Sequence, residues 1–490
     1  MTTITLPIDP KHFWAIVALA GFVLAVAVVY AAMPRTEGKH TNPLDRLKDI
    51  LGLAQFGDGL FLLLALMWSG LFLALFTGLL LMLWELIWFA VPQNPSAEAS
   101  ARFALLRLAA MTATLGAVVA LPFTLIRIRL TREANKTADE SLFNDKINAA
   151  TEDLHAMRQR WDEERKQNIW EDDITRRNAA IDRLEGLVKE RPDTAPRVSR
   201  LLSVYVRELS REVPAEIPPE EPTPNELDSW LFGLTVKRSD MENAVQVLGR
   251  MKRIRAVNCV SISIDLRHAN LQRFDLTGLD LSGAILSGSH MQGSFLRDTQ
   301  FRNASLPFAK MQGTNLGNAK MLTSNLNWAD LRQAFLGGAM LRGASLRHAD
   351  MQGAKLYDAE LQKADFTSTN LRGADLSGAK MQGIRLGGAN MQGADISATT
   401  IDGSSGLNRA DLSGSLLRQV DFSRTNIGLE QLNSGFGTTD TILPDGSGPD
   451  SSDWPAHWPK IALKDPESLT QWRKWQADPD NYIPPTAPDE

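Results

Sequence analysis

Histidine, cysteine and carboxylate side chains most often carry chemistry in proteins, and in this chain their spacing does not bring them together. The seven histidines are scattered, and the single cysteine, Cys259, excludes a paired-cysteine zinc motif and an intramolecular disulfide. Its apolar neighbours predict a buried thiol. Carboxylates such as Asp330, Asp350 and Asp375 recur at multiples of five residues, which indicates a repeat and not an acid–base pair. We therefore predict no catalytic residue, no metal site and no cofactor, and we do not expect an enzyme.

The same five-residue step runs through the centre of the chain. From Leu266 to Ile401 an apolar residue occupies every fifth position, 28 times in succession, and the residue two before it is Ala, Ser or Thr in 24 cases. Neither an α-helix nor a β-strand has a period of five. A short fixed period is typical of a solenoid, in which each unit buries its apolar side chain by stacking on its neighbours. The glycines follow this step too, so they do not indicate a phosphate-binding loop.

Individual repeats resemble a known family. Residues 374–378 (ADLSG) and 269–273 (ANLQR) resemble the pentapeptide-repeat family, whose unit is A(D/N)LXX. The resemblance implies a right-handed quadrilateral β-helix in which the central apolar residue and the small residue two before it point inward. A coil with four sides of five residues predicts a 20-residue period along each side.

That longer period is present on one side of the predicted coil. The residue after every fourth central position is Gln or Arg in seven successive turns: Gln272, Gln292, Gln312, Arg332, Gln352, Arg372 and Gln392. Side-chain amides at the spacing of neighbouring strands, about 4.8 Å, can bond to one another as a ladder. We interpret this Gln/Arg column as mainly structural. Its secondary candidates for partner binding are Gln292, Gln312, Arg332, Gln352 and Arg372.

Another side of the predicted coil carries aromatic residues two positions after the centre. Phe308, Trp328 and His348 fall 20 residues apart, so we expect them to stack on three adjacent turns. An exposed aromatic strip can anchor a protein partner, and these residues are the first candidate binding site. The alternative is that the C-terminal segment 433–490, which contains four tryptophans, folds back and covers the strip.

Three apolar segments precede the repeat, within residues 1–130. Each is long enough to cross the hydrocarbon core of a bilayer, so we predict transmembrane helices at about residues 13–33, 59–90 and 104–126. Lys and Arg are concentrated after the first and third segments. The sequence therefore predicts a multi-pass protein of the bacterial inner (plasma) membrane, with the N-terminus outside and the C-terminal domain cytoplasmic. Small residues at four-residue steps in the second segment favour close helix packing, within the chain or in a homo-oligomer.

Composition predicts five further regions. They are a helical stalk (131–212), a Pro-rich acidic linker (213–238), an N-terminal capping helix (239–256), the pentapeptide-repeat β-helix (257–432, with a break near 402–408) and a Trp-rich C-terminal tail (433–490). The S-x-x-E spacing of Ser239 and Glu242 indicates the capping helix. The break follows from a step of eleven residues between the central positions Ile401 and Leu412. The tail is expected to cap the last coil or to bind a partner.

The balance of basic and acidic residues in the repeat indicates which kind of partner it can bind. Residues 262–402 contain 14 Lys plus Arg against 12 Asp plus Glu. Some pentapeptide-repeat proteins imitate the acidic surface of DNA and bind topoisomerases, and this balance disfavours that alternative. We expect no nucleic-acid partner. The favoured interpretation is a non-catalytic scaffold that is anchored in the lipid bilayer and binds an unidentified cytoplasmic protein. A second alternative is a transport or channel accessory subunit.

Overall fold

The computed structural model of the 490-residue chain describes residues 47–49, 51, 53–89 and 95–486. The first predicted membrane segment, about residues 13–33, lies outside the described residues. The chain divides into two compact units, Met1–Asp145 and Lys146–Glu490, and each is described by itself.

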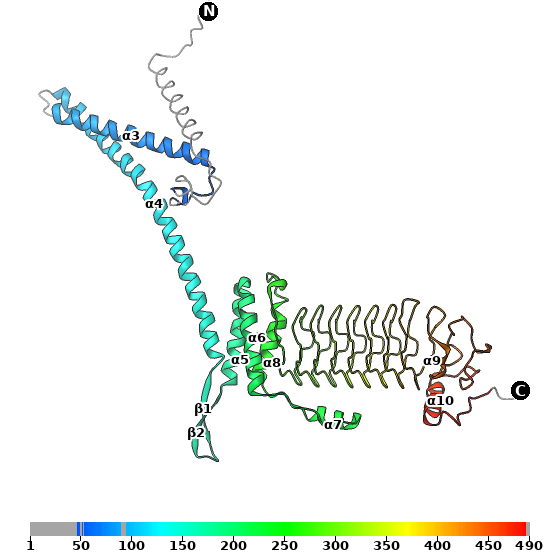
Figure 1. Ribbon diagram of the computed structural model, residues 1–490. Coiled ribbons are helices and arrows are strands. Elements are labelled where there is room, and N and C mark those ends of the chain that lie inside the picture. Colours follow the sequence, from blue (N-terminus) through cyan, green and yellow to red (C-terminus); the bar gives the residue numbers. More distant parts are fainter. Residues whose placement is uncertain (1–46, 50, 52, 90–94, 487–490) are drawn as a thin grey trace, which may run out of the picture. The chain divides into compact units, whose positions relative to one another are not determined.

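Two long helices form most of the described part of the first unit (Figure 1). Helix α3 spans Asp58–Phe89, and helix α4 begins at Pro95 and ends at Asp153. Both are long and apolar enough to cross a membrane. Helix α3 covers the second predicted segment (59–90) as far as Phe89, and α4 includes the third (104–126). The helices contact each other where the Trp68 indole Nε1 donates to the Val118 carbonyl oxygen at 3.2 Å.

Helix α4 does not end at the predicted boundary between the membrane domain and the stalk. It continues without interruption through residue 130 to Asp153. Residues 127–153 contain neither glycine nor proline, so nothing in this stretch breaks the hydrogen-bonding pattern of the helix. The predicted helical stalk therefore begins as a continuation of the apolar helix.

The predicted stalk is also not entirely helical. Strands β1 (Met157–Asp162) and β2 (Gln167–Asp172) form an antiparallel hairpin, in which an ion pair of 2.7 Å joins Arg158 to Glu171 across the strands. The tight connection contains no glycine, and Lys166 takes a left-handed conformation with φ of 50°. Glycine, the usual sequence signal of a hairpin turn, is thus missing. For this reason the sequence does not predict the two strands.

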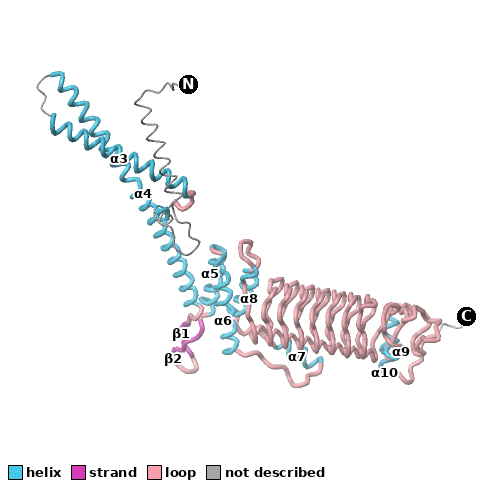
Figure 2. The backbone as a smooth tube through the Cα atoms, turned by 45° about the horizontal axis from the view of Figure 1, so that its top comes forward, coloured by secondary structure: helices cyan, strands magenta, loops and turns pink. Residues whose placement is uncertain are grey.

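Three helices follow the hairpin and pack together. They are α5 (Ile174–Glu190), α6 (Ala195–Glu212) and α8 (Ser239–Met251), and α8 contacts both of the others. A short 3₁₀ turn, η1 (Pro192–Thr194), connects α5 to α6. In both views of the molecule the three helices stand beside the first turns of the coil (Figures 1 and 2). The glutamate Oε1 of Glu242 in α8 accepts from the Asp275 amide at 2.6 Å, which joins the helix to the coil.

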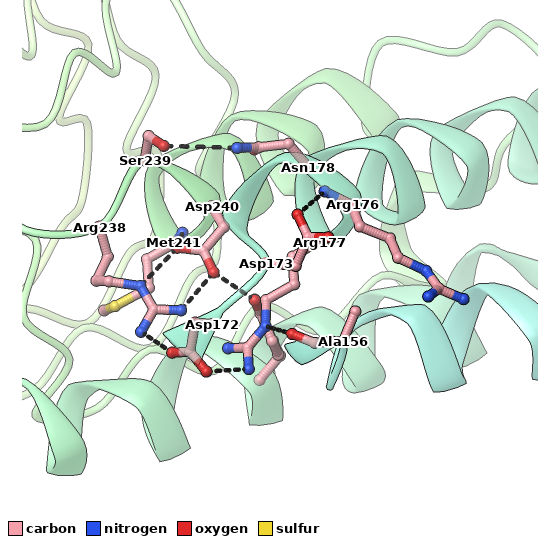
Figure 3. A network of polar contacts seen from close by, with 11 residues as sticks. Ala156, Asp172, Asp173, Arg176, Arg177, Asn178, Arg238, Ser239, Asp240 and Met241 are labelled. Carbon is pink, nitrogen blue, oxygen red and sulfur yellow. Dashed lines mark hydrogen bonds and ion pairs between the residues drawn. The ribbon is translucent and has the colours of Figure 1, made fainter. Parts of the chain in front are cut away.

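A buried network of charged groups ties this helical module together (Figure 3). The Arg238 guanidinium donates to Asp240 at 2.6 and 2.9 Å and to Asp172 of the hairpin at 2.6 Å. Arg177 of α5 forms the second ion pair to Asp172, and the Tyr205 hydroxyl of α6 donates to Asp240 at 2.7 Å. One network thus links the hairpin with α5, α6 and the start of α8.

This environment fixes the charge of Asp240, whose side chain is fully buried. Burial acts to raise the pKa of Asp240, but the hydrogen bonds from Arg238 and Tyr205 outweigh it and hold the pKa below its ordinary value. A carboxyl group whose folded-state pKa is lowered stabilises the fold above its unfolded pKa of about 4. That contribution is lost as the pH falls through the lowered pKa, so the network is intact at neutral pH.

The repeat folds into a coil in which residues 20 apart pair as parallel bridges. The series begins with Asp265 and Ile285 and continues without a gap to Lys380 and Thr400. Every central apolar residue from Leu266 to Ile396 is at most 1% exposed. The predicted 20-residue period and the inward-pointing central residues are therefore present in the coil.

The register changes where the sequence predicts a break. In the three pairs that follow, from Arg385 and Gly406 to Asp395 and Leu416, the paired residues lie 21 apart, because one extra residue loops out between them. The Ser405 hydroxyl donates to the Met381 carbonyl oxygen at 3.0 Å and holds the loop to the turn before it. The bridge between Asp421 and Ile442 extends the coil beyond its predicted end at residue 432.

The C-terminal segment covers the last turns of the coil. It contains α9 (Leu429–Asn433) and α10 (Asp465–Ala477). Trp475 packs on Phe436 in a buried cluster, and the Trp458 indole donates to the Gly435 carbonyl oxygen at 2.8 Å. Of the two expectations for the tail, capping the last coil is the one that these contacts support.

The prediction of a buried thiol at Cys259 is wrong. Cys259 is exposed in the short 3₁₀ turn η2 (Cys259–Ser261), which precedes the coil. Its apolar neighbour Val260 is 93% exposed, so this apolar run does not enter the core.

The network at Asp240 makes a testable prediction about the helical module. Arg238→Met leaves the buried Asp240 carboxylate without its cation, and removing one partner of a buried ion pair costs roughly 3 kcal/mol or more. We therefore expect faster hydrogen exchange of the α8 amides in the full-length variant, measured by mass spectrometry over residues 239–251.

The matched control is Arg267→Met, which removes a half-exposed guanidinium that pairs with Asp265 at 2.8 Å. Exposed ion pairs contribute little, so exchange of α8 should not change in this variant. Unchanged exchange of α8 in Arg238→Met would show that the network does not hold the module together.

Candidate functional site

The aromatic residues predicted as the first candidate site stack on one another. The ring centroids of Phe308 and Trp328 lie 6.3 Å apart with planes inclined by 12°, and those of Trp328 and His348 lie 4.2 Å apart at 15°. Phe308 is 57% and Trp328 52% exposed, and His348 is also exposed. Three successive turns of the coil therefore present one continuous aromatic column to the solvent.

The backbone of the coil fixes the spacing of this column. The amide of Phe308 donates to the Asn327 carbonyl oxygen at 3.0 Å, and the amide of Trp328 donates to the Arg347 carbonyl oxygen at 2.9 Å. Each ring is thus attached to a residue whose main chain is hydrogen-bonded to the next turn. The rings need no rearrangement to form a flat contact surface, which lowers the entropic cost of binding.

The aromatic residues occupy a backbone conformation that bulky side chains rarely adopt. The φ angles are 59° at Phe308, 62° at Trp328 and 57° at His348, whereas Gly288 and Gly388 occupy the equivalent position in neighbouring turns. Glycine adopts this left-handed region without strain, and large side chains do so at a cost. Large aromatic rings are not needed to build this corner, because Ser368 occupies the equivalent position with a φ of 59°.

The tail does not cover the aromatic column in the described part of the chain. Trp472 donates to the Gly414 carbonyl oxygen at 2.9 Å, and Trp475 stacks with His457 at a centroid distance of 4.9 Å. These contacts hold the tail at the last turns, and no described contact joins it to Phe308 or Trp328. The alternative in which the tail folds back over the column is therefore not found.

The Gln/Arg column is less accessible than the sequence predicts. Gln292 is 1% and Gln312 2% exposed. Gln272 donates to the Gln292 side-chain oxygen at 3.1 Å, but Gln312 donates to Asp330 instead, so the amide ladder is interrupted. The secondary candidates at the N-terminal end of the coil are buried and do not form a free surface.

The remaining members of this column differ from one another. Arg332 lies between Asp330 at 2.7 Å and Asp350 at 3.6 Å, and burial together with the charge of Asp330 raises the pKa of Asp350. Gln352 is half-buried, and Arg372 is exposed. The column therefore does not bring its five candidates together as one site.

A helix in the predicted linker covers the buried part of the Gln/Arg column. Helix α7 spans Pro224–Gly233, and Leu227, Leu231 and Leu234 form a small buried cluster. Leu231 lies against the column, because a Cβ atom on Gly313 would be 2.2 Å from its Cδ1 atom. The segment 213–238, predicted as a Pro-rich acidic linker, thus contains a helix that packs on the coil.

Two sequence signals identify this helix in hindsight. Thr223 and Glu226 form a capping box, and Pro224 occupies the first turn. Ahead of the helix, the Gln272 side chain exchanges two hydrogen bonds with the Glu216 backbone, at 2.8 and 2.9 Å. Residues 214–233 thus lie along the coil and form a strap. The glycines that follow Gln292 and Gln312 in the sequence, Gly293 and Gly313, leave room for Leu231 of this strap.

No site for metal or acid–base chemistry emerges from the residues described here. Within residues 47–486, apart from the short gaps, no three His, Cys, Asp or Glu side chains gather in a way that suits a metal ion. His290 and His457 are half-buried, and this partial burial lowers the pKa of both imidazoles. The His457 ring Nε2 lies 2.8 Å from the Gly435 carbonyl oxygen, which is a structural contact of the tail.

Each turn of the coil contains 20 residues, both ends of the coil are covered, and aromatic side chains form a column on its surface. These features define a capped repeat solenoid. A family model described as "Pentapeptide repeats" matches this coil in eight copies, over residues 263–298, 280–318, 324–362 and 369–405. The coil is therefore a pentapeptide-repeat domain, as the sequence resemblance predicts. No curated protein matches the chain.

The chain is also similar to solved pentapeptide-repeat structures. HetL from the cyanobacterium Nostoc, which is involved in regulating heterocyst differentiation, is 26% identical, with 37% of this chain and 92% of HetL covered and a TM-score of 0.23. Full-length QnrB1, a plasmid-mediated fluoroquinolone resistance protein, is 19% identical, with coverages of 43% and 96% and a TM-score of 0.18. A protein of the Arabidopsis thaliana thylakoid lumen is 27% identical, with coverages of 23% and 63% and a TM-score of 0.10.

The close fit of Leu231 makes a prediction about the strap. Gly313→Ala should displace α7, because the new methyl group would collide with Leu231. The control is Gly373→Ala, since Gly373 has a similar positive φ (64° against 62°) and no atom within 4 Å of an added Cβ. The two variants share the backbone strain and differ only in the contact with α7.

Limited proteolysis of the full-length variants measures the displacement of α7 through cleavage within the strap, at residues 214–223. We expect cleavage to be at least about fivefold faster in Gly313→Ala than in Gly373→Ala, because a displaced strap exposes its backbone. Equal cleavage rates would mean that α7 does not depend on this contact.

Proposed function

We propose that this chain is a non-catalytic scaffold of the bacterial inner membrane, and that the aromatic column Phe308–Trp328–His348 binds a cytoplasmic protein. The observation that carries the proposal is the exposed stack of these three rings. Aromatic side chains are enriched among the residues that contribute most to protein interfaces, and they bind best when held rigidly. The coil, which we infer to be the right-handed quadrilateral β-helix of its family, supplies that rigidity.

The membrane anchor in this proposal consists of three transmembrane helices with the N-terminus outside. Support comes from the apolar helices α3 and α4 and from the apolar segment at about residues 13–33. The basic residues that follow the first and third segments favour a cytoplasmic location for the coil. A homo-oligomer through the small residues of the second segment is compatible with this arrangement.

Neither alternative function has a specific observation in its favour. Imitation of DNA requires a dense negative field, and residues 262–402 carry 14 basic against 12 acidic side chains. The likeness to QnrB1 is too distant to support topoisomerase binding. A role as a transport or channel accessory subunit is not supported by any feature of the described helices.

The exposed Cys259 tests the topology without any added label site. A thiol reagent that does not cross the inner membrane should leave Cys259 unlabelled in spheroplasts and label it after lysis, because the coil is on the cytoplasmic side. Cys259→Ser provides the control, since it removes the only thiol of the chain. Labelling of intact spheroplasts would place the coil outside and refute the proposed orientation.

The docking role predicts the loss of a partner when the column is removed. Proteins captured on full-length protein should be quantified by mass spectrometry beside the double variant Phe308→Ser, Trp328→Ser. Two anchoring rings contribute about 2 kcal/mol or more, so we expect at least a roughly 30-fold loss of one partner.

The matched control is the double variant Trp161→Ser, Phe232→Ser, which removes one tryptophan and one phenylalanine elsewhere. Trp161 is 51% and Phe232 89% exposed, so the control removes at least as much exposed aromatic surface. Retention of the same partner by the column variant, or its equal loss from the control, would argue against docking at this column.

A further inference from the structure

A cavity of about 770 Å³ lies between the end of α4, the start of β1 and the outer face of α6. All of its lining residues belong to the unit Lys146–Glu490. Its apolar walls consist of Ile147, Leu154, Met157, Val198, Leu201, Val204 and Leu209. The volume is within the range of small-molecule binding sites, about 300–1,000 Å³, and an apolar wall is typical of such sites.

The cavity leaves apolar side chains of α6 without a packing partner. On the face toward α5 and α8, Leu202 and Val206 are fully buried. On the cavity side Val204 is 40% exposed, and Met157 on the opposite wall is 49% exposed. A helix with apolar side chains on two sides normally has both sides covered. An apolar ligand in the cavity would therefore complete the packing of α6.

A buried cation belongs to the same cavity lining. The Arg177 residue is 5% exposed, and its guanidinium donates through Nε to the Ala156 carbonyl oxygen at 3.1 Å and through Nη2 to Asp172 (Figure 3). Among the described residues no group accepts a hydrogen bond from Nη1. A guanidinium group with a free donor beside an apolar wall suits a carboxylate or phosphate oxygen.

The charges at the rim also favour an anion. Arg200 lines the cavity, is exposed and forms no ion pair with any described residue. Of the three carboxylates in the lining, Asp172 already takes two guanidinium groups and Glu208 pairs with Arg211 at 3.0 Å. Glu212 is the remaining one, at the C-terminal end of α6. Arg200 thus supplies a positive charge that no described carboxylate pairs, and Arg177, which is paired with Asp172, supplies its remaining Nη1 donor.

We propose that this cavity binds an anionic amphiphile, with its carboxylate or phosphate at Arg177 and Arg200 and one acyl chain along the walls of α4 and α6. The helix α4 that forms one wall is the same helix that carries an apolar stretch long enough to cross a membrane. A free fatty acid and a membrane phospholipid share this chemistry. The site is separate from the aromatic column, and the proposal does not depend on a partner docking there.

The test uses the full chain in phosphatidylcholine nanodiscs with a photoreactive palmitate as the probe. After irradiation, mass spectrometry should find the probe on peptides covering residues 146–157 and 197–212. A second sample with a photoreactive phosphatidylglycerol in the nanodisc distinguishes the two sources of the acyl chain. Labelling by palmitate alone identifies a fatty-acid site, and labelling by the lipid identifies a phospholipid site; either result supports the proposal.

Matched variants connect the labelling to the cavity. Val204→Trp fills the cavity and should reduce labelling of these peptides by at least about fivefold, because the ligand loses its space. Val236→Trp makes the same change at a residue with nearly the same exposure, 38% against 40%, and should label like the wild type. Leu201→Trp serves as a second filling variant if hydrogen exchange of α8 shows that Val204→Trp does not fold.

Three results would overturn the proposal. The first is labelling confined to the apolar parts of α3 and α4, and the second is equal labelling of the wild type and a folded cavity-filling variant. The third concerns the anionic group: palmitate should displace the probe at least about tenfold better than hexadecanol, because the alcohol lacks the charge that binds Arg177 and Arg200. Equal displacement by the two compounds would refute the role of these arginines.

Discussion

Main-chain hydrogen bonds between successive turns of the coil determine the spacing of the side chains on its surface. The amide of Leu326, for example, donates to the Ser345 carbonyl oxygen at 2.7 Å, and the same step recurs along the coil. The inward leucine and the small residue before it keep the turns close enough for these bonds, since both are buried at nearly every turn. A side chain on the surface is therefore repeated at a fixed spacing, which turns single aromatic residues into a column.

Both ends of such a coil present unpaired main-chain groups, and the chain covers each end differently. At the N-terminal end, α8 is bound to the first turn and is held in turn by the ion pairs around Asp240. At the C-terminal end, Trp458 and Trp472 donate to carbonyl oxygens of the last turns. Covered ends prevent the coil from pairing with another chain edge to edge. The exposed surface available to partners is thus confined to the sides of the coil.

The sequence predicts the coil well because its rule is local and repeats many times. The five-residue step, the 20-residue period and the extra residue after Ile401 all follow from the types of residue at fixed positions, and so does the stacking of Phe308 on Trp328. The strap is missed because five prolines between 214 and 224 resemble an unstructured linker, while the fit of Leu231 over Gly313 depends on two segments distant in the chain. The hairpin after α4 is missed because its turn contains no glycine. The burial of Gln292 and Gln312 is missed because the strap that covers them is not predicted.

The proposal that the aromatic column is the docking surface can be tested most directly by crosslinking in living cells. Full-length protein would carry the photoreactive amino acid benzoylphenylalanine in place of Phe308 or, separately, of Phe295, which is 40% exposed and lies outside the column. A docking role for the column predicts a single protein adduct from position 308 that is absent from position 295. The same adducts from both positions, or none from position 308, would contradict it.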